Sequence, residues 1–248
     1  MESFTFNYAV RMQPLPKKRS PNGDDAYFVS VANRTVGVFD GVGGWGEIEG
    51  GNAAEYSQRL SESAQNFSGC QHGDEVIDNA FRVVGTSIRG STTVALAKIV
   101  DAGLEFFILG DSLCGQLRDN RMIFKTEPLL HGWNFPFQLG MNSRDTPKSG
   151  TTDFVDIRNR DLIICASDGL WDNLFDKEIE AIAENSKDLE EFADNLITHA
   201  KSRQNNENEC ISPFSFVQNG YSPVKECGKP DDTTIVVLEI VSNKTDEL

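Results

Sequence analysis

In the segment 35–45, an apolar run is followed directly by a carboxylate side chain. The run Thr-Val-Gly-Val-Phe is followed by Asp40 and Gly41, and then by Val-Gly-Gly-Trp. Beta-branched and aromatic residues are typical of a strand, so the pattern predicts a strand that carries an acid at its tip. Asp40 offers side-chain oxygens and Gly41 an approachable main-chain carbonyl, and a hard divalent cation prefers ligands of these kinds.

Other acids stand at the ends of strand-like runs in the same way: Asp24, Asp25, Asp111, Asp168, Asp231 and Asp232. Taken alone, Asp24 and Asp25 would be explained by turn chemistry. If the strand ends converge, the carboxylates can share a small space only when metal cations neutralise them. The sequence therefore suggests a metal site built from several strand ends.

The elements that would position these acids can be read from hydrophobic patterns. Helices are predicted at 52–67, 75–89, 176–183 and 188–201. Strands are predicted within 1–19 (an edge strand), at 26–32, 35–40, 162–168 and 233–240, and in an antiparallel meander at 91–100, 104–109, 115–118 and 121–126. Because regular strand–helix alternation is lacking, we expect antiparallel sheets with helices packed outside.

Two segments have loop-like composition, 128–150 and 202–229. The first holds Trp133, Phe135 and Phe137, which could line a substrate surface. Packing of these aromatic side chains into the fold is the preferred interpretation.

The bulk composition limits the classes of function. With 248 residues, the chain is expected to form a single domain over 1–248. No apolar run approaches the roughly 20 residues of a membrane helix, so no membrane partner is expected. The formal net charge of −15 argues against nucleic acid as a partner.

The five cysteines include no CxxC pair, so neither a disulfide framework nor a zinc site is predicted. A reducing compartment fits best, and without a recognisable signal peptide the cytoplasm is expected.

Six short motifs occur in the order that marks the metal-dependent protein phosphatases of type 2C. They are Asp24-Asp25, Phe39 to Trp45, Gly90-Ser-Thr-Thr93, Leu109-Gly-Asp111-Ser112, Ser167 to Asn173 and Asp231-Asp232-Thr-Thr-Ile-Val-Val. The resemblance covers about residues 20–241 and is closest to the branch that contains the yeast mitochondrial phosphatase seven. It implies a four-layer αββα sandwich, an α+β fold with two antiparallel sheets flanked by helix pairs, and a metal site at the sheet ends.

The resemblance also implies roles for particular residues. Asp40 matches the carboxylate that bridges two metal ions. Asp168 and Asp231 match further ligands of the first ion, and Asp24 and the Gly41 carbonyl match ligands of the second. The implied ions are Mg²⁺ or Mn²⁺, which together activate a bridging water for attack on phosphorus.

Three other acids match positions around this pair of ions. Asp25 matches an acid that orients water, and Asp111 and Asp172 match acids of a weaker third metal site. The implied substrate is a phosphoprotein carrying phosphoserine or phosphothreonine. A monomer is expected, and the branch suggests mitochondria as an alternative to the cytoplasm.

Two positions depart from the family pattern. Many members have a histidine two residues after the bridging aspartate, proposed to protonate the leaving group, and this chain has Val42 there. His72, His131 and His199 are expected to be ordinary surface or packing histidines. The family's phosphate-holding arginine would fall at Ser20, so we hypothesise that the neighbouring Arg19 reaches the substrate phosphate.

Three alternatives remain open. The chain could be a catalytically impaired phosphatase-fold regulatory protein, or a small-molecule phosphohydrolase using the same metals. An aspartyl-phosphate phosphatase with Asp40 as nucleophile is disfavoured, because that chemistry usually needs a second aspartate where Val42 stands.

Overall fold

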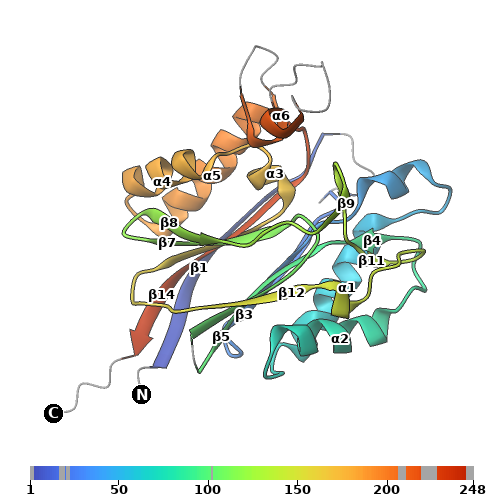
Figure 1. Ribbon diagram of the computed structural model, residues 1–248, viewed down its shortest axis with the longest axis horizontal. Helices are drawn as coiled ribbons and strands as arrows, with labels where there is room; N and C mark the ends of the chain where they lie inside the picture. The colour runs from blue at the N-terminus through green and yellow to red at the C-terminus, as the bar shows by residue number, and fades with distance from the viewer. Residues whose placement is uncertain are drawn as a thin grey trace.

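Two antiparallel sheets lie face to face, and helices cover the outer face of each (Figure 1). The computed structural model describes residues 3–16, 20, 23–101, 103–205, 211–218 and 228–243. The layers follow the order helix, sheet, sheet, helix, which confirms the predicted αββα sandwich. No helix in this described part of the chain is long and apolar enough to cross a membrane.

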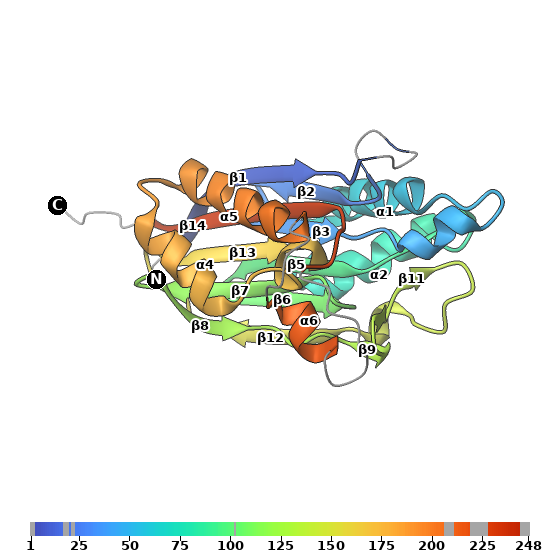
Figure 2. The ribbon, with the colours of Figure 1, turned by 90° about the horizontal axis from the view of Figure 1, so that it is seen from above.

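The first sheet has five strands in the order β1 (Ser3–Gln13), β14 (Thr233–Asn243), β13 (Leu162–Ala166), β7 (Leu113–Arg118) and β8 (Arg121–Lys125). Its outer face is covered by α4 (Asp176–Asn185) and α5 (Leu189–Gln204), as Figure 2 shows. Helix α5 contacts β1 and β14, and α4 contacts β8. The short helix α3 (Asp168–Trp171) follows β13 directly.

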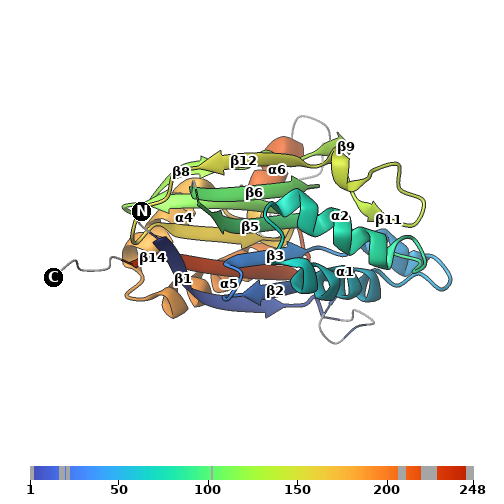
Figure 3. The ribbon, with the colours of Figure 1, turned by 90° about the horizontal axis from the view of Figure 1, so that it is seen from below.

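The second sheet has five strands in the order β12 (Thr151–Val155), β6 (Gly103–Leu109), β5 (Val94–Val100), β3 (Thr35–Phe39) and β2 (Ala26–Ser30). Figure 3 shows α1 (Ala53–Phe67) and α2 (Gly73–Val84) on its outer face. The remaining short elements are η1 (Gly43–Glu47), β4 (Ser91–Thr92), β9 (Leu130–Gly132), β10 (Phe135–Pro136), β11 (Leu139–Gly140), η2 (Pro147–Ser149) and α6 (Pro213–Gln218).

Local sequence explains where the helices begin and end. The side chain of Asn52 accepts a hydrogen bond from Glu55 N (3.1 Å) and so caps α1. Helix α2 ends at Val84 because Gly85 adopts a positive φ of 59°, which favours glycine and ends a helix. The predicted extension of this helix to residue 89 is therefore wrong.

The prediction of one continuous meander over 91–126 is also wrong. Strands β5 and β6 pair in the second sheet, whereas β7 and β8 pair in the first. Between them the chain turns at Gly110, whose φ of 110° is a conformation that L side chains rarely adopt. The hydrophobic pattern of each strand is the same in either sheet, so it could not reveal the change of sheet.

The two loop-like segments contain short elements. Phe137 packs against the core under α1 and α2, as predicted for a loop aromatic. Trp133 and Phe135 are 46% and 54% exposed, so the packing interpretation is wrong for them. In the second segment α5 continues to Gln204, and α6 occupies Pro213–Gln218.

Candidate metal centre

Strand register brings the predicted acids to one end of the sandwich. Ala26 pairs with Phe39, so Asp25 and Asp40 lie next to each other at the ends of β2 and β3. Strands β3 and β6 both pair antiparallel with β5, so Asp111 leaves the sheet at the same end as Asp40. In the first sheet the antiparallel pairing of β13 and β14 places Asp168 near the residues that open β14.

Three of these acids form a compact group. Carboxylate oxygens of Asp40, Asp111 and Asp168 lie within 4.8 Å of one another. Asp40 and Asp111 follow strands of the second sheet, and Asp168 follows a strand of the first. The group therefore joins the two sheets across the interface between them.

A lysine ammonium joins further acids to this group. Lys229 Nζ contacts Asp168 Oδ2, and it lies 3.1 Å from Asp172 Oδ2 and 3.5 Å from Asp231 Oδ2. Sequence reasoning missed this residue. The signal that could have found it is its place in the chain, because Lys229 stands two positions before the predicted ligand Asp231, in the segment Gly-Lys-Pro-Asp-Asp.

The electrostatics of the group disfavour the ionised carboxylates. Burial, then the charges of Asp168 and Asp25, raise the pKa of Asp40 well above its usual range. Burial likewise raises the pKa of Asp111, with Asp168 adding to the effect. Burial raises the pKa of Asp172 to about 6, although Lys229 opposes the shift. A concentration of positive charge at this place would relieve the repulsion.

Asp25 lies beside the group in a buried position. Its Oδ2 accepts a hydrogen bond from Ser167 Oγ (2.9 Å), and Ser167 Oγ accepts one from Thr234 N (3.0 Å). Burial, followed by the charge of Asp232, raises the pKa of Asp25 to about 8. Oδ1 of Asp25 and Oδ1 of Asp168 are buried without a hydrogen-bond partner among the described residues.

Both Asp-Gly motifs need glycine because another backbone passes close by. A Cβ at Gly41 would lie 2.3 Å from the carbonyl oxygen of Asp24, and one at Gly169 would lie 2.0 Å from that of Asp232. These glycines allow the acid-bearing loops to pack together.

Residues of the Gly-Ser-Thr-Thr motif hold the backbone of Asp40. Its carbonyl oxygen accepts hydrogen bonds from Thr92 Oγ1 (2.8 Å) and Thr93 N (2.9 Å). Thr93 Oγ1 also bonds to Ser112 Oγ (2.7 Å), which stands next to Asp111. The motif thus fixes the strand end of Asp40 relative to that of Asp111.

Asp24 lies at the edge of the site. Its N donates to Asp232 Oδ2 (2.7 Å), and its carbonyl oxygen accepts from Ser57 Oγ (2.6 Å). The carboxylate of Asp24 is not a member of the group within 4.8 Å. Asp232 also accepts from Leu15 N (2.6 Å), so this acid ties the end of β1 and the start of β2 to the start of β14.

The remaining predicted residues are placed as follows. Arg19 lies outside the described residues. Val42 lines a groove of about 860 Å³ together with Trp45, His131 and Phe135. His131 Nε2 pairs with Asp145 Oδ2 at 2.9 Å.

The other two histidines lie elsewhere. His72 Nδ1 pairs with Glu105 Oε2 (2.8 Å), and His199 Nδ1 bonds to the carbonyl oxygen of Asn195 (2.7 Å).

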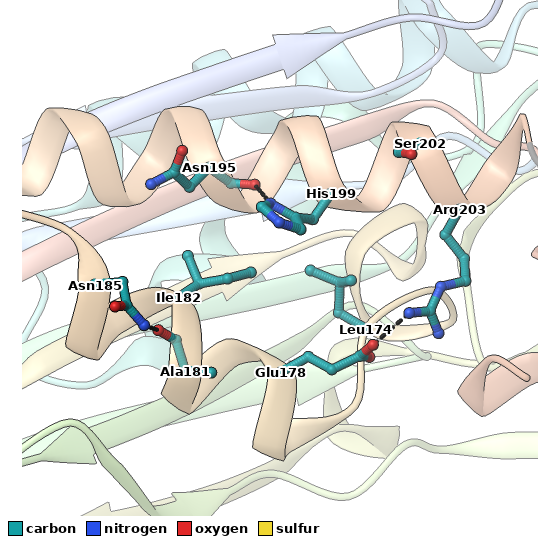
Figure 4. Close-up of a pocket in the computed structure, with 9 residues that line it drawn as sticks. All are labelled: Leu174, Glu178, Ala181, Ile182, Asn185, Asn195, His199, Ser202 and Arg203. Atoms are coloured by element: carbon teal, nitrogen blue, oxygen red, sulfur yellow. Dashed lines mark hydrogen bonds and ion pairs between the residues drawn. The ribbon is translucent and has the colours of Figure 1, made fainter.

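A separate cavity of about 550 Å³ lies between α4 and α5 (Figure 4). Glu178 and Arg203 form an ion pair on its wall. None of the acids at the sheet ends lines it. It is therefore not the candidate site.

The acids at the sheet ends fit a metal ion. The group offers oxygen donors, and two buried carboxylate oxygens lack partners among the described residues. Oxygen donors favour hard ions such as Mg²⁺ and Mn²⁺.

Fold and site together define a class of proteins in which carboxylates from two stacked sheets gather at one end of a sandwich. The structure of the photosystem II phosphatase PBCP matches with a TM-score of 0.85 and 26% identity, covering 94% of this chain and 98% of that one. The catalytic domain of the phosphatase PstP, in complex with two manganese ions, matches with a TM-score of 0.69. At 19% identity over 96% of this chain and 100% of that chain, PstP shares the fold.

Sequence similarity to curated proteins shows the family to which this chain belongs. Probable protein phosphatase 2C 26 of Arabidopsis thaliana is 31% identical over 257 residues, covering 96% of this chain and 85% of the relative. Probable protein phosphatase 2C 80 of the same plant is 32% identical over 93% of this chain and 57% of its own length. Protein phosphatase 2C homolog 7, mitochondrial, of Saccharomyces cerevisiae is 28% identical over 96% of this chain and 83% of its own. The chain belongs to the protein phosphatase 2C family, which confirms the resemblance seen in the motifs.

The extent of these matches varies. The chain spans 57% and 51% of the length of the first two curated relatives. No family model matches the chain.

Proposed function

We propose that this chain is a serine/threonine protein phosphatase that hydrolyses phosphoserine and phosphothreonine with two divalent ions, Mg²⁺ or Mn²⁺. One observation carries the proposal: carboxylate oxygens of Asp40, Asp111 and Asp168, from both sheets, lie within 4.8 Å of one another. Family membership supports phosphoproteins as the substrate class. We further propose that residues 1–248 act as one catalytic domain and as a monomer.

The proposed ligands follow the family pattern. Asp40 would hold both ions, and Asp168 and Asp231 would be the other protein ligands of the first. Asp24 and the Gly41 carbonyl would hold the second, which is supported by the close approach of these two backbones. When bound, two such ions lower the pKa of a water molecule and offset the charge on the phosphoryl oxygens.

Other residues support the reaction without bridging the ions. Asp25, held by Ser167, orients the attacking water and accepts its hydrogen bond. Asp111 and Asp172 would hold a more weakly bound third ion. Val42 has no proton to give, so it takes no part in protonating the leaving alkoxide.

The test is hydrolysis of a phosphothreonine peptide with Mn²⁺ or Mg²⁺, with EDTA, and with Asp40→Asn. We expect EDTA to abolish turnover and Asp40→Asn to lower kcat/KM on the order of 100-fold or more, since a catalytic metal contributes several kcal/mol. The matched control is Asp78→Asn, which removes an acid paired with Arg82 on α2 and should leave turnover unchanged. Absence of turnover in folded, metal-loaded protein would overturn the proposal in favour of a regulatory role.

The same assay examines the other open assignments. Arg19→Ala should raise KM if Arg19 holds the phosphate, and an unchanged KM would remove that role. A higher kcat/KM on phosphorylated metabolites than on phosphopeptides would favour a small-molecule phosphohydrolase. For location, we propose the cytoplasm, and the name of the yeast relative supports mitochondria as the alternative.

A further inference from the structure

The side chain of Lys229 ends inside the acid cluster. Its Nζ contacts Asp168 Oδ2 and lies 3.1 Å from Asp172 Oδ2 and 3.5 Å from Asp231 Oδ2. Only 14% of the lysine side chain is exposed. Lys229 thus supplies positive charge at the acids that the proposed function assigns to metal ions.

The fold holds Lys229 in this position. Its N donates to Asn173 Oδ1 (3.0 Å), and Asn173 Nδ2 donates to the carbonyl oxygen of Lys229 (3.1 Å). Asn173 is fully buried. A Cβ at Gly228 would lie 2.6 Å from Asn173 Oδ1 and 2.7 Å from the carbonyl oxygen of Arg203, so glycine is required there. Pro230 disfavours a helical conformation at Lys229.

An aromatic ring lies on another side of the ammonium. The ring centroid of Phe214 is 5.6 Å from Lys229 Nζ. Phe214 N donates to the carbonyl oxygen of Asp172 (3.0 Å), so the ring is fixed to the loop that carries the acids. An aromatic face attracts a cation, and this arrangement therefore favours the ammonium at the cluster.

The positions of Lys229 and of a divalent ion conflict. An oxygen that accepts a hydrogen bond from an ammonium cannot also bind a divalent ion at ligand distance without strong repulsion between the two cations. We propose that Lys229 is a tethered cation that competes with the divalent metal for Asp168 and Asp231, and that it thereby sets the metal affinity of the site. The inference rests on the proposed metal-dependent function and names the residue that tunes it.

The test is direct Mn²⁺ binding by titration calorimetry on protein freed of metal with EDTA and then dialysed. We expect Lys229→Met to bind Mn²⁺ about tenfold more tightly or better, because the competing charge is gone. The matched control is Lys125→Met, which removes a lysine paired with Asp176 (2.6 Å) at the edge of the first sheet and should leave Mn²⁺ affinity unchanged. An affinity of Lys229→Met that equals or falls below that of the wild type would overturn the inference.

A second measurement needs no variant. If Lys229 and metal compete, Mn²⁺ must release the amine from its acids in the wild-type protein. Acetylation of Lys229 by acetic anhydride, followed by mass spectrometry, should therefore be slow in EDTA and faster with saturating Mn²⁺, while acetylation of Lys125 stays constant. Equal or slower acetylation of Lys229 with Mn²⁺ would contradict the competition.

The two proposals fail in different ways. Mn²⁺ binding that Asp40→Asn removes and Lys229→Met leaves unchanged would overturn the role of Lys229 and leave the metal site standing. Tighter binding by Lys229→Met, without phosphatase turnover, would support the role of Lys229 and overturn the proposed function. Absence of Mn²⁺ binding in the wild type would overturn both.

Discussion

At the scale of single residues, the environment of Asp25 shows how burial and neighbouring charge act on an acid of the site. Its carboxylate is buried, takes one hydrogen bond from Ser167, and has an Oδ1 with no partner in the described part of the structure. Burial and the charge of Asp232 raise its pKa from 3.8 to about 8. In protein without metal, the fold therefore favours the protonated form of Asp25.

This environment predicts a pH dependence of stability in EDTA. Between pH 3.8 and about 8 the folded state keeps a proton on Asp25 that the unfolded chain releases. The stabilisation of the folded state by this proton is complete below pH 3.8 and is lost as the pH rises through about 8. The slope is at most about 1.4 kcal/mol per pH unit. The raised pKa of Asp172, about 6, likewise makes the folded state less stable as the pH rises, over the narrower range from pH 3.8 to about 6.

Urea unfolding of wild type and Asp25→Asn in EDTA, at pH values from 5 to 8, measures this effect. The variant keeps a neutral side chain at all these pH values, so its advantage over the wild type should grow as the pH rises. A difference in unfolding free energy that stays constant across the range would show that Asp25 does not titrate abnormally.

At the scale of elements, the site consists of strand ends and the loops that follow them. Asp40 follows β3, Asp111 follows β6, and Asp168 follows β13. These loops pack closely because Gly41 and Gly169 leave room for neighbouring backbones. The missing side chains of these glycines therefore allow the acids to take their positions.

Gly169→Ala tests this packing. The added Cβ would lie 2.0 Å from the carbonyl oxygen of Asp232, and backbone cannot move aside as a flexible side chain can. We expect a loss of about 3 kcal/mol in the free energy of unfolding. The matched control is Gly44→Ala, where a Cβ meets no heavy atom within 4 Å, and its effect should be within about 0.5 kcal/mol. Equal effects of the two substitutions in urea unfolding would refute the close-packing account.

At the scale of the whole molecule, the site is divided between the two sheets. The second sheet supplies Asp40 and Asp111, and the first supplies Asp168. The distance between the sheets therefore decides whether the three acids can share an ion. That distance depends on the side chains packed between them, among which Phe106 of β6 stacks on Phe124 of β8 with ring centroids 5.8 Å apart.

Phe106→Ala should weaken the whole sandwich. Phe106 is fully buried, so its removal is expected to cost about 3–5 kcal/mol of unfolding free energy. Phe154→Ala, in the neighbouring strand β12, removes a ring that is 60% exposed and should cost less than about 1 kcal/mol. Chemical denaturation of both variants checks the difference, and similar midpoints would mean that Phe106 does not hold the sheets together.

The sequence by itself determined the strands of the two main sheets except β12, the acids at strand tips and the four main helices. It could do so because hydrophobic period and turn residues act over a few neighbours, as in 35–40 or in α1. The order of the motifs also identified the family. The sequence could not predict the change of sheet between β6 and β7, because the hydrophobic pattern of a strand is the same in either sheet.

Only the tertiary structure decided which acids meet and what lies among them. It gathered Asp40, Asp111 and Asp168, and left the Asp24 carboxylate outside that group. It also placed the Lys229 ammonium against Asp168. These are contacts between residues distant in the chain, and they depend on the register of two sheets and on the packing between them, which no local pattern records.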